Sequence, residues 1–248
     1  MNQLIVPGAI KERISLMKSE PRVIRTKNFA ADAADLILEQ ARKAINERNE
    51  FRIALSGGNT PQPIYARLAA VGHDLPWDLI RITFGDERCV PPDDQQSNFR
   101  MAWETLLAPA AVPEESILRM RGEIDPQIAA QEYQDHLNRM ASQRSEPIYR
   151  HDLVLLGLGD DGHTASLFPG TAALEETIRL VVANFVPKLN AWRLTFTFPL
   201  INRARHILFL VGATKNPGLI QRVLDGDREL PAARVDPSAG EVTWVIGE

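Results

Sequence analysis

Two periodicities of hydrophobic and polar residues alternate along the chain. In residues 28–48, apolar side chains recur every three or four positions among Glu, Lys and Arg, which predicts an amphipathic helix. Short apolar or β-branched runs follow, and segments with helical spacing separate many of them. The predicted strands are residues 52–55, 80–84, 153–156, 180–183, 194–198, 207–211 and 242–246, and the further predicted helices are residues 61–70, 98–107, 126–140 and 216–224.

This alternation of strands and helices predicts an α/β fold with a mostly parallel sheet that is covered by helices on both faces. The run Leu-Val-Leu-Leu at residues 153–156 is apolar at every position, as is typical of a strand buried at the centre of such a sheet. The sequence contains no internal repeat, and the polar connection at residues 142–150 is too short to separate two domains. We therefore expect one domain over residues 1–248, in which residues 1–27 are an N-terminal extension of unclear role.

The composition limits the classes of protein and of partner. A chain of 248 residues that is 44% hydrophobic is long enough to bury a full core. A formal net charge of −4 argues against nucleic-acid binding, which needs a dominant basic face, so an anionic ligand requires a local basic pocket. Cys89 has no second cysteine with which to form a disulfide, and no apolar run approaches the roughly 20 residues that cross a bilayer. We expect a cytoplasmic protein that does not bind a membrane.

Ligands of an open parallel sheet bind beyond the carboxyl ends of its strands, so the residues that follow each predicted strand are the first candidates for a site. The first unusual segment follows residues 52–55 and opens a helix. Its two glycines let backbone amides turn toward a ligand, and its hydroxyl and amide side chains add hydrogen bonds, which predicts an anion-binding nest at a helix N-terminus. The alternative is a tight turn with a helix cap. The segment consists of Ser56, Gly57, Gly58, Asn59, Thr60 and Pro61.

That glycine segment has neither the Walker lysine nor the three-glycine dinucleotide pattern, so it indicates neither a nucleoside triphosphate nor NAD. Ser56 also lacks the Gly-x-Ser-x-Gly elbow of a nucleophilic serine, and we expect no covalent serine catalysis.

The second unusual segment is Gly85-Asp86-Glu87-Arg88, directly after the predicted strand 80–84. The planar guanidinium of Arg88 suits bidentate contacts with a phosphate, and the carboxylates of Asp86 and Glu87 suit sugar hydroxyls. A solvated charged turn is the alternative interpretation of the same four residues.

The third segment, residues 157–170, leaves the most apolar strand and contains His163 two residues after Asp161. A histidine that an aspartate holds in one tautomer acts as a general base near neutral pH, which is what attack by water requires. A polar loop residue is the alternative. We predict no metal site, because no ligand spacing relates His163 to the other histidines. These are His73, His136, His151 and His206.

Three further basic residues, Lys188, Arg193 and Lys215, lie near the ends of predicted strands. Each by itself has the pattern of a surface charge.

Taken together and in this order, the three segments strongly resemble the 6-phosphogluconolactonase family, a branch of the larger group that includes glucosamine-6-phosphate deaminase. The resemblance covers the chain from about residue 51 onward. It implies a Rossmann-like fold, a 6-phosphorylated lactone as substrate and no required cofactor. In the family, serine is frequent where this chain has Asn59.

The residues after His163 distinguish the branches of this group. Here they read Thr-Ala-Ser-Leu-Phe-Pro-Gly over residues 164–170, which resembles the lactonases, whereas the deaminases have an Asn-Glu-Pro segment and use its glutamate in ring opening. The resemblance therefore implies hydrolysis of 6-phospho-D-glucono-1,5-lactone to 6-phospho-D-gluconate. The alternatives are a glucosamine-6-phosphate deaminase or isomerase and a non-catalytic sugar-phosphate sensor.

We expect His163 to activate water and Asp161 to orient His163 or a substrate hydroxyl. The substrate phosphate is expected at the amides of the glycine segment, with Arg88, Arg193 and Lys215 as the candidate basic groups around it. Asp86 and Glu87 are expected either to contact the sugar or to fix Arg88. A monomer or a weak homodimer is expected, with a small-molecule sugar-phosphate lactone as its ligand and no nucleic-acid partner. The residues predicted to bind substrate are Ser56, Gly57, Gly58, Asn59, Thr60, Asp86, Glu87, Arg88, Arg193 and Lys215.

Overall fold

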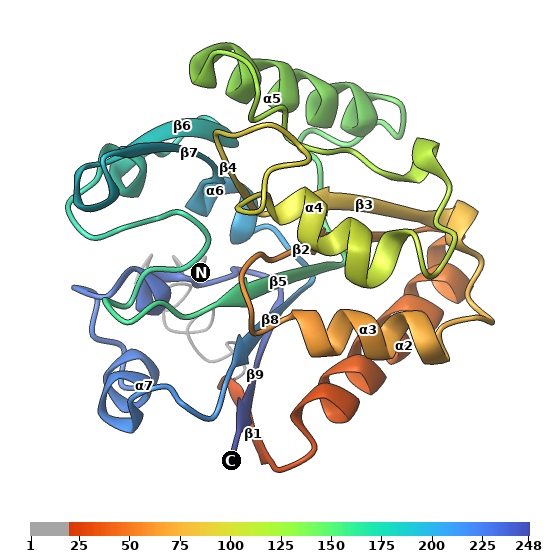
Figure 1. Ribbon diagram of the computed structural model, residues 1–248, viewed down its shortest axis with the longest axis horizontal. Coiled ribbons are helices and arrows are strands. Elements are labelled where there is room, and N and C mark those ends of the chain that lie inside the picture. The colour runs from red at the N-terminus through yellow and green to blue at the C-terminus, as the bar shows by residue number, and fades with distance from the viewer. Residues whose placement is uncertain (1–19) are drawn as a thin grey trace, which may run out of the picture.

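Two β-sheets of different kinds organise the chain in this computed structural model, which describes residues 20–248 (Figure 1). The larger sheet has six strands in the order β1-β9-β8-β5-β2-β3, and every neighbouring pair in it is parallel. The smaller sheet has three antiparallel strands in the order β4-β7-β6. The strands of the larger sheet are β1 (Arg22–Thr26), β2 (Phe51–Leu55), β3 (Ile80–Phe84), β5 (Leu153–Gly157), β8 (His206–Val211) and β9 (Glu241–Gly247), and those of the smaller sheet are β4 (Asp86–Arg88), β6 (Val181–Val186) and β7 (Ala191–Phe196).

Helices cover both faces of the larger sheet, as the sequence predicts. Alternate residues of β5 separate two hydrophobic cores: Leu153 and Leu155 pack in the core that holds α2 and α3, and Val154 and Leu156 pack in the core that holds α5 and α7. A strand buried on both sides must be apolar at every position, which explains the unbroken run. The helices are α2 (Phe29–Arg48), α3 (Gln62–Val71), α4 (Asn98–Ala102), α5 (Pro126–Ser142), α6 (Phe198–Ile201) and α7 (Pro217–Leu224).

Shorter helical segments connect these elements. The predicted helix over residues 98–107 is α4 followed by a π-helical turn, Trp103–Leu107. The remaining segments are the 3₁₀ helices Trp77–Leu79, Glu114–Ser116, Ala172–Glu175, Pro187–Leu189 and Pro231–Arg234. No helix within residues 20–248 is both long enough and apolar enough to span a bilayer.

The N-terminal part of the chain differs from the expectation. Arg22–Thr26 is not part of a separate extension but forms β1, which pairs in parallel with β9 at the edge of the larger sheet. This edge strand carries two arginines and has no fully buried residue, so its sequence lacks the apolar signal of the other strands. Residues 1–19 of the expected extension lie outside the described residues.

The charged segment after β3 is also not a simple turn. Asp86–Arg88 forms β4 and pairs with β7, so that Asp86 lies opposite Thr195 and Arg88 lies opposite Arg193. Residues directly opposite one another on antiparallel strands point to the same face. The smaller sheet therefore presents Asp86 and Arg88 together with Arg193, which lies about a hundred residues later in the sequence.

Candidate active site

The three unusual segments meet in one cleft at the carboxyl ends of β2, β3 and β5. From β2 the chain continues to β3 on one side, and from β5 it continues to β8 on the other, so the order reverses between β2 and β5. Such a reversal opens a crevice between the loops, and this is where ligands of doubly wound sheets bind. Of the predicted residues, the cleft is lined by Ser56, Gly57, Gly58, Asn59, Thr60, Asp86, Arg88 and His163; Glu87, Asp161, Arg193 and Lys215 do not line it.

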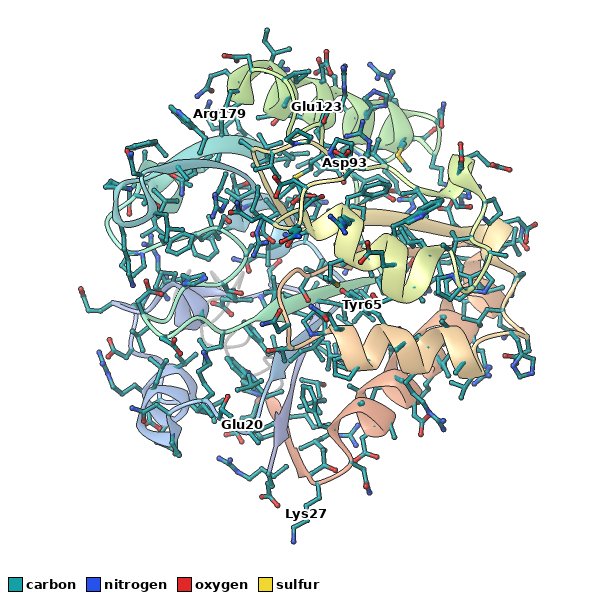
Figure 2. The ribbon with its side chains drawn as sticks, in the orientation of Figure 1. Glu20, Lys27, Tyr65, Asp93, Glu123 and Arg179 are labelled. Atoms are coloured by element: carbon teal, nitrogen blue, oxygen red, sulfur yellow. The ribbon has the colours of Figure 1, made fainter. Side chains whose placement is uncertain are left out.

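A tyrosine from α3 fixes the start of the glycine segment. The buried Tyr65 (Figure 2) accepts a hydrogen bond from the Ser56 amide at 3.0 Å and donates one to the Ser56 carbonyl at 2.8 Å. The segment then turns through Gly58, whose φ of +88° favours glycine. Ser56 lines the cleft, but its hydroxyl is buried beneath the cleft surface.

Asn98, at the start of α4, connects the glycine segment to the charged strand, and sequence reasoning missed it. Its side-chain amide donates to the Asp86 carbonyl at 2.9 Å and to Asp86 Oδ1 at 3.3 Å. It also packs against Gly57 so closely that a Cβ atom there would lie 1.9 Å from Asn98 Oδ1. A glycine is therefore required at position 57 because any side chain there would collide with Asn98, and not because the backbone adopts an unusual angle. The only local signal was a Ser-Asn pair at a helix start, which is typical of capping.

Asp86 is held from the opposite side by Ser166 of the third segment. The Ser166 hydroxyl donates to Asp86 Oδ2 at 2.7 Å, and its amide donates to Thr195 Oγ1 at 3.1 Å. Ser166 is buried, so this contact joins the His163 loop to both β4 and β7. Asp86 thus lines the cleft in a fixed orientation.

Glu87 does not have the expected role as a substrate contact. Its buried carboxylate points away from the cleft and accepts hydrogen bonds from the backbone amides of Asn98 (2.7 Å) and Phe99 (2.8 Å) and from the Ser97 hydroxyl (3.1 Å). Burial raises the pKa of Glu87, and the backbone hydrogen bonds oppose this rise. Glu87 therefore caps α4 and places Asn98 against the glycine segment.

We expect Glu87→Gln to lower the free energy of unfolding by about 1–3 kcal/mol, because the glutamine NH₂ group cannot accept the hydrogen bonds that one carboxylate oxygen accepts. Urea unfolding compared with Glu104→Gln, an exposed glutamate in the following π turn, measures this difference. Equal stability of the two variants would contradict the capping role of Glu87.

Two guanidinium groups lie side by side next to the cleft. Arg88 and Arg193 are cross-strand partners, and among the described residues neither forms an ion pair with a carboxylate. Arg88 donates to the Gln96 carbonyl, and Arg193 donates to the Trp192 carbonyl at 3.0 Å. Burial, and then the charge of Arg88, lower the pKa of Arg193. Two neighbouring cations that are not ion-paired favour an anionic ligand.

Lys215 is not part of this pair. It donates to Asp160 Oδ1 at 2.6 Å instead, and this hydrogen bond lowers the pKa of the exposed Asp160. The structure therefore brings Lys215 to the His163 loop, where it balances a charge, rather than to the two arginines.

His163 is fixed on three sides. Its Nδ1 lies 2.5 Å from Asp161 Oδ1, and its ring stacks on Phe168 with 3.9 Å between the ring centroids. The third contact is with Gly159, where a Cβ atom would lie 2.1 Å from Nδ1. Because a carboxylate only accepts hydrogen bonds, Nδ1 carries the proton and Nε2 is left as the basic nitrogen.

The carboxylate of Asp161 is ionised. Burial alone would raise its pKa, but hydrogen bonds from His163 and from Lys188, whose Nζ lies 3.0 Å from Asp161 Oδ2, lower it to about 2. An ionised carboxylate holds the imidazole in one orientation and stabilises the charge that the ring gains when it takes a proton. Among residues 20–248, no group of three or more His, Cys, Asp and Glu side chains is arranged to hold a metal ion.

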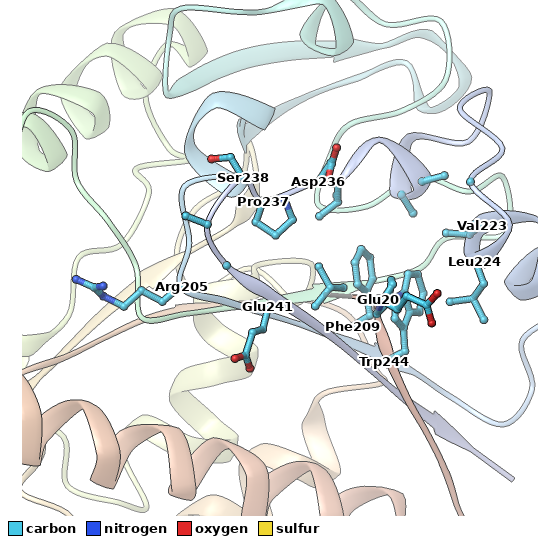
Figure 3. Close-up of a pocket in the computed structure, with 18 residues that line it drawn as sticks. Glu20, Arg205, Phe209, Val223, Leu224, Asp236, Pro237, Ser238, Glu241 and Trp244 are labelled. Atoms are coloured by element: carbon cyan, nitrogen blue, oxygen red, sulfur yellow. The ribbon is translucent and has the colours of Figure 1, made fainter. Parts of the chain in front are cut away.

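A second pocket lies against β8 and β9 and contains none of the predicted site residues (Figure 3). The stacked rings of Phe209 and Trp244 line it, with 3.8 Å between their centroids. Three exposed acidic residues line it, Glu20, Asp236 and Glu241, against the single arginine Arg205, and this excess of negative charge disfavours a phosphorylated ligand. The cleft at the glycine segment is therefore the better candidate for an active site.

Fold and cleft together define a doubly wound α/β protein whose site combines a glycine segment, a pair of arginines and an aspartate–histidine pair. Residues 25–244 match the family model described as glucosamine-6-phosphate isomerases/6-phosphogluconolactonase. The chain belongs to this family.

Known proteins agree with this assignment. The chain is 44% identical to a 6-phosphogluconolactonase of Synechocystis sp., over 83% of this chain and 85% of the relative. It is 33% identical to the human 6-phosphogluconolactonase, over 90% of this chain and 88% of the relative. A crystal structure of 6-phosphogluconolactonase from Thermotoga maritima superimposes with a TM-score of 0.80 at 26% identity, covering 92% of this chain and 100% of that one. The expected Rossmann-like α/β fold is thereby confirmed.

Proposed function

We propose that this protein hydrolyses 6-phospho-D-glucono-1,5-lactone to 6-phospho-D-gluconate in the oxidative pentose phosphate pathway. The observation that carries the proposal is the Asp161–His163 pair at a cleft that Arg88 lines, with Arg193 as the cross-strand neighbour of Arg88. The names of the similar proteins support the same reaction.

In this proposal the substrate phosphate binds at the amides of the glycine segment, with Arg88 and Arg193 beside it. The helix α3 begins directly after the segment, so its positive end adds to the attraction. Asp86, which Asn98 and Ser166 hold in place, accepts hydrogen bonds from sugar hydroxyls. The phosphate is remote from the reacting carbonyl, so its binding energy contributes to the rate by orienting the lactone.

His163 Nε2 then takes a proton from a water molecule as the water oxygen attacks C1 of the lactone. The tetrahedral intermediate collapses with cleavage of the bond between C1 and the ring oxygen. The protonated His163 returns its proton to that oxygen, which leaves as the C5 hydroxyl, and Asp161 stabilises the imidazolium between the two transfers.

The assay that tests this function follows acid release from freshly prepared lactone in a pH-stat, relative to spontaneous hydrolysis. Ammonia release from glucosamine-6-phosphate tests the deaminase alternative, which residues 164–170 disfavour because they contain no glutamate. Binding of 6-phosphogluconate without turnover of either substrate would favour the sensor alternative and contradict the lactonase.

We infer that residues 20–248 form one catalytic domain, because both sheets contribute to the cleft. A cytoplasmic location agrees with the single cysteine, and burial raises the pKa of its thiol to about 11. The proposed reaction uses the side chains of this chain alone, in a monomer or a weak homodimer and without a cofactor.

A further inference from the structure

The hairpin formed by β6 and β7 reaches from the smaller sheet to the His163 loop. Its strands pair from Val181 with Phe196 to Val186 with Ala191, and the turn Pro187–Leu189 closes it. Lys188 lies in this turn, and its Nζ donates to Asp161 Oδ2 at 3.0 Å. Its side chain is 68% exposed, and no other hydrogen bond of it is found among residues 20–248. The ammonium group at the turn of the hairpin thus contacts Asp161, which is the hydrogen-bond partner of the proposed base His163.

The carboxylate of Asp161 is occupied at both oxygens by different partners. Oδ1 faces His163 Nδ1, and Oδ2 faces Lys188. These two contacts together restrain rotation of the carboxylate about its last side-chain bond, and with it the orientation of the imidazole.

We propose that Lys188 is a positioning residue for lactone hydrolysis: its ammonium group holds the Asp161 oxygen that His163 does not use, and thereby sets the orientation and the basicity of His163. This inference rests on the proposed function. The inference gives the hairpin a role in the reaction, because its turn residue Lys188 positions Asp161 without contacting the substrate.

The sign of the effect follows from the charges around the pair. The positive charge of Lys188 opposes protonation of His163, because it neutralises part of the Asp161 charge that stabilises the imidazolium. The other charged groups near the pair are Asp160, on the same loop, and Lys215, which follows β8, and these two form an ion pair with each other. Removal of the Lys188 charge therefore leaves His163 as the remaining hydrogen-bonded partner of the Asp161 carboxylate.

The hairpin has its own source of stability, so that Lys188 can be replaced without loss of the fold. Phe185 and Trp192 are cross-strand partners whose ring centroids lie 5.4 Å apart. Such an aromatic pair stabilises an antiparallel ladder independently of the turn residues.

The test compares Lys188→Met, which keeps the length of the side chain, with Lys188→Arg, which keeps the charge. Lys43→Met, at an exposed position of α2, is the control. In Lys188→Met we expect the acid limb of the pH dependence of kcat/KM to move up by about half a pH unit, so that kcat/KM below the limb falls roughly threefold. We expect kcat to fall and KM to change little, and we expect Lys188→Arg and Lys43→Met to keep the wild-type limb.

An NMR titration of the His163 imidazole reads the same interaction without turnover. Its midpoint should rise in Lys188→Met and stay in place in Lys188→Arg. An unchanged titration midpoint in Lys188→Met overturns the inference, whatever the activity. A raised midpoint in a protein that does not hydrolyse the lactone supports the contact of Lys188 with the pair and rejects the proposed function, so the two failures are distinguishable.

Discussion

Replacing His163 with asparagine is expected to lower kcat for lactone hydrolysis on the order of 10²–10⁴-fold. The asparagine amide can still donate to Asp161, but it offers no basic nitrogen at the position of Nε2. Because the glycine segment and Arg88 are untouched, binding of 6-phosphogluconate should stay within a few-fold of the wild type. A coupled dehydrogenase assay with the spontaneous rate subtracted measures kcat, and isothermal calorimetry measures product binding.

The matched control for this variant is His73→Asn, at an exposed position that does not line the cleft, which should keep full activity. Full activity of His163→Asn would reject His163 as the base. Loss of product binding together with activity would instead indicate that the variant disturbs the cleft, and would leave the acid–base role without support.

Replacing Arg88 with alanine is expected to have the second largest effect, and to act on binding rather than on the chemical step. A charge-assisted hydrogen bond contributes about 1.5–3 kcal/mol, which corresponds to roughly a 10- to 150-fold rise in KM. Arg193 would be left without its cationic neighbour and would still attract the phosphate, so binding should be weakened but not abolished. Steady-state kinetics, with inorganic phosphate as a competitive inhibitor, measures the change.

Arg67→Ala is the control for Arg88→Ala, because Arg67 is an exposed arginine of α3 that lies outside the cleft. An unchanged KM and an unchanged inhibition by phosphate in Arg88→Ala would remove Arg88 from the anion site and leave the amides of the glycine segment as its main component. A fall in kcat alone would place Arg88 at the reacting carbonyl, which contradicts the proposed orientation of the substrate.

Much of the fold was predictable because hydrophobic periodicity is a local property. The strands of the larger sheet between β2 and β9 each bury apolar residues on at least one face, and their sequences therefore carry the signal. The location of the cleft followed in the same way, since carboxyl ends of neighbouring parallel strands lie at one edge. The segments containing Gly57, Asp86 and His163 were identified from this rule and from their residue types.

The tertiary structure alone decided which of these residues share a role. The pairing of β4 with β7 brings Arg88 to Arg193, and the packing of α4 turns Glu87 away from the cleft and Asn98 toward Gly57. These contacts join residues that are distant in sequence or that follow one another on opposite faces of a strand, and no local pattern encodes them.

The sequence by itself thus determined the fold class and the three segments of the site, because burial within a strand and turning at a glycine are local requirements. The order of the strands in the two sheets, the edge strand β1 and the contact of Lys188 with Asp161 depended on the tertiary structure. Their energies come from cross-strand hydrogen bonds and from charges that become neighbours only when the chain is folded.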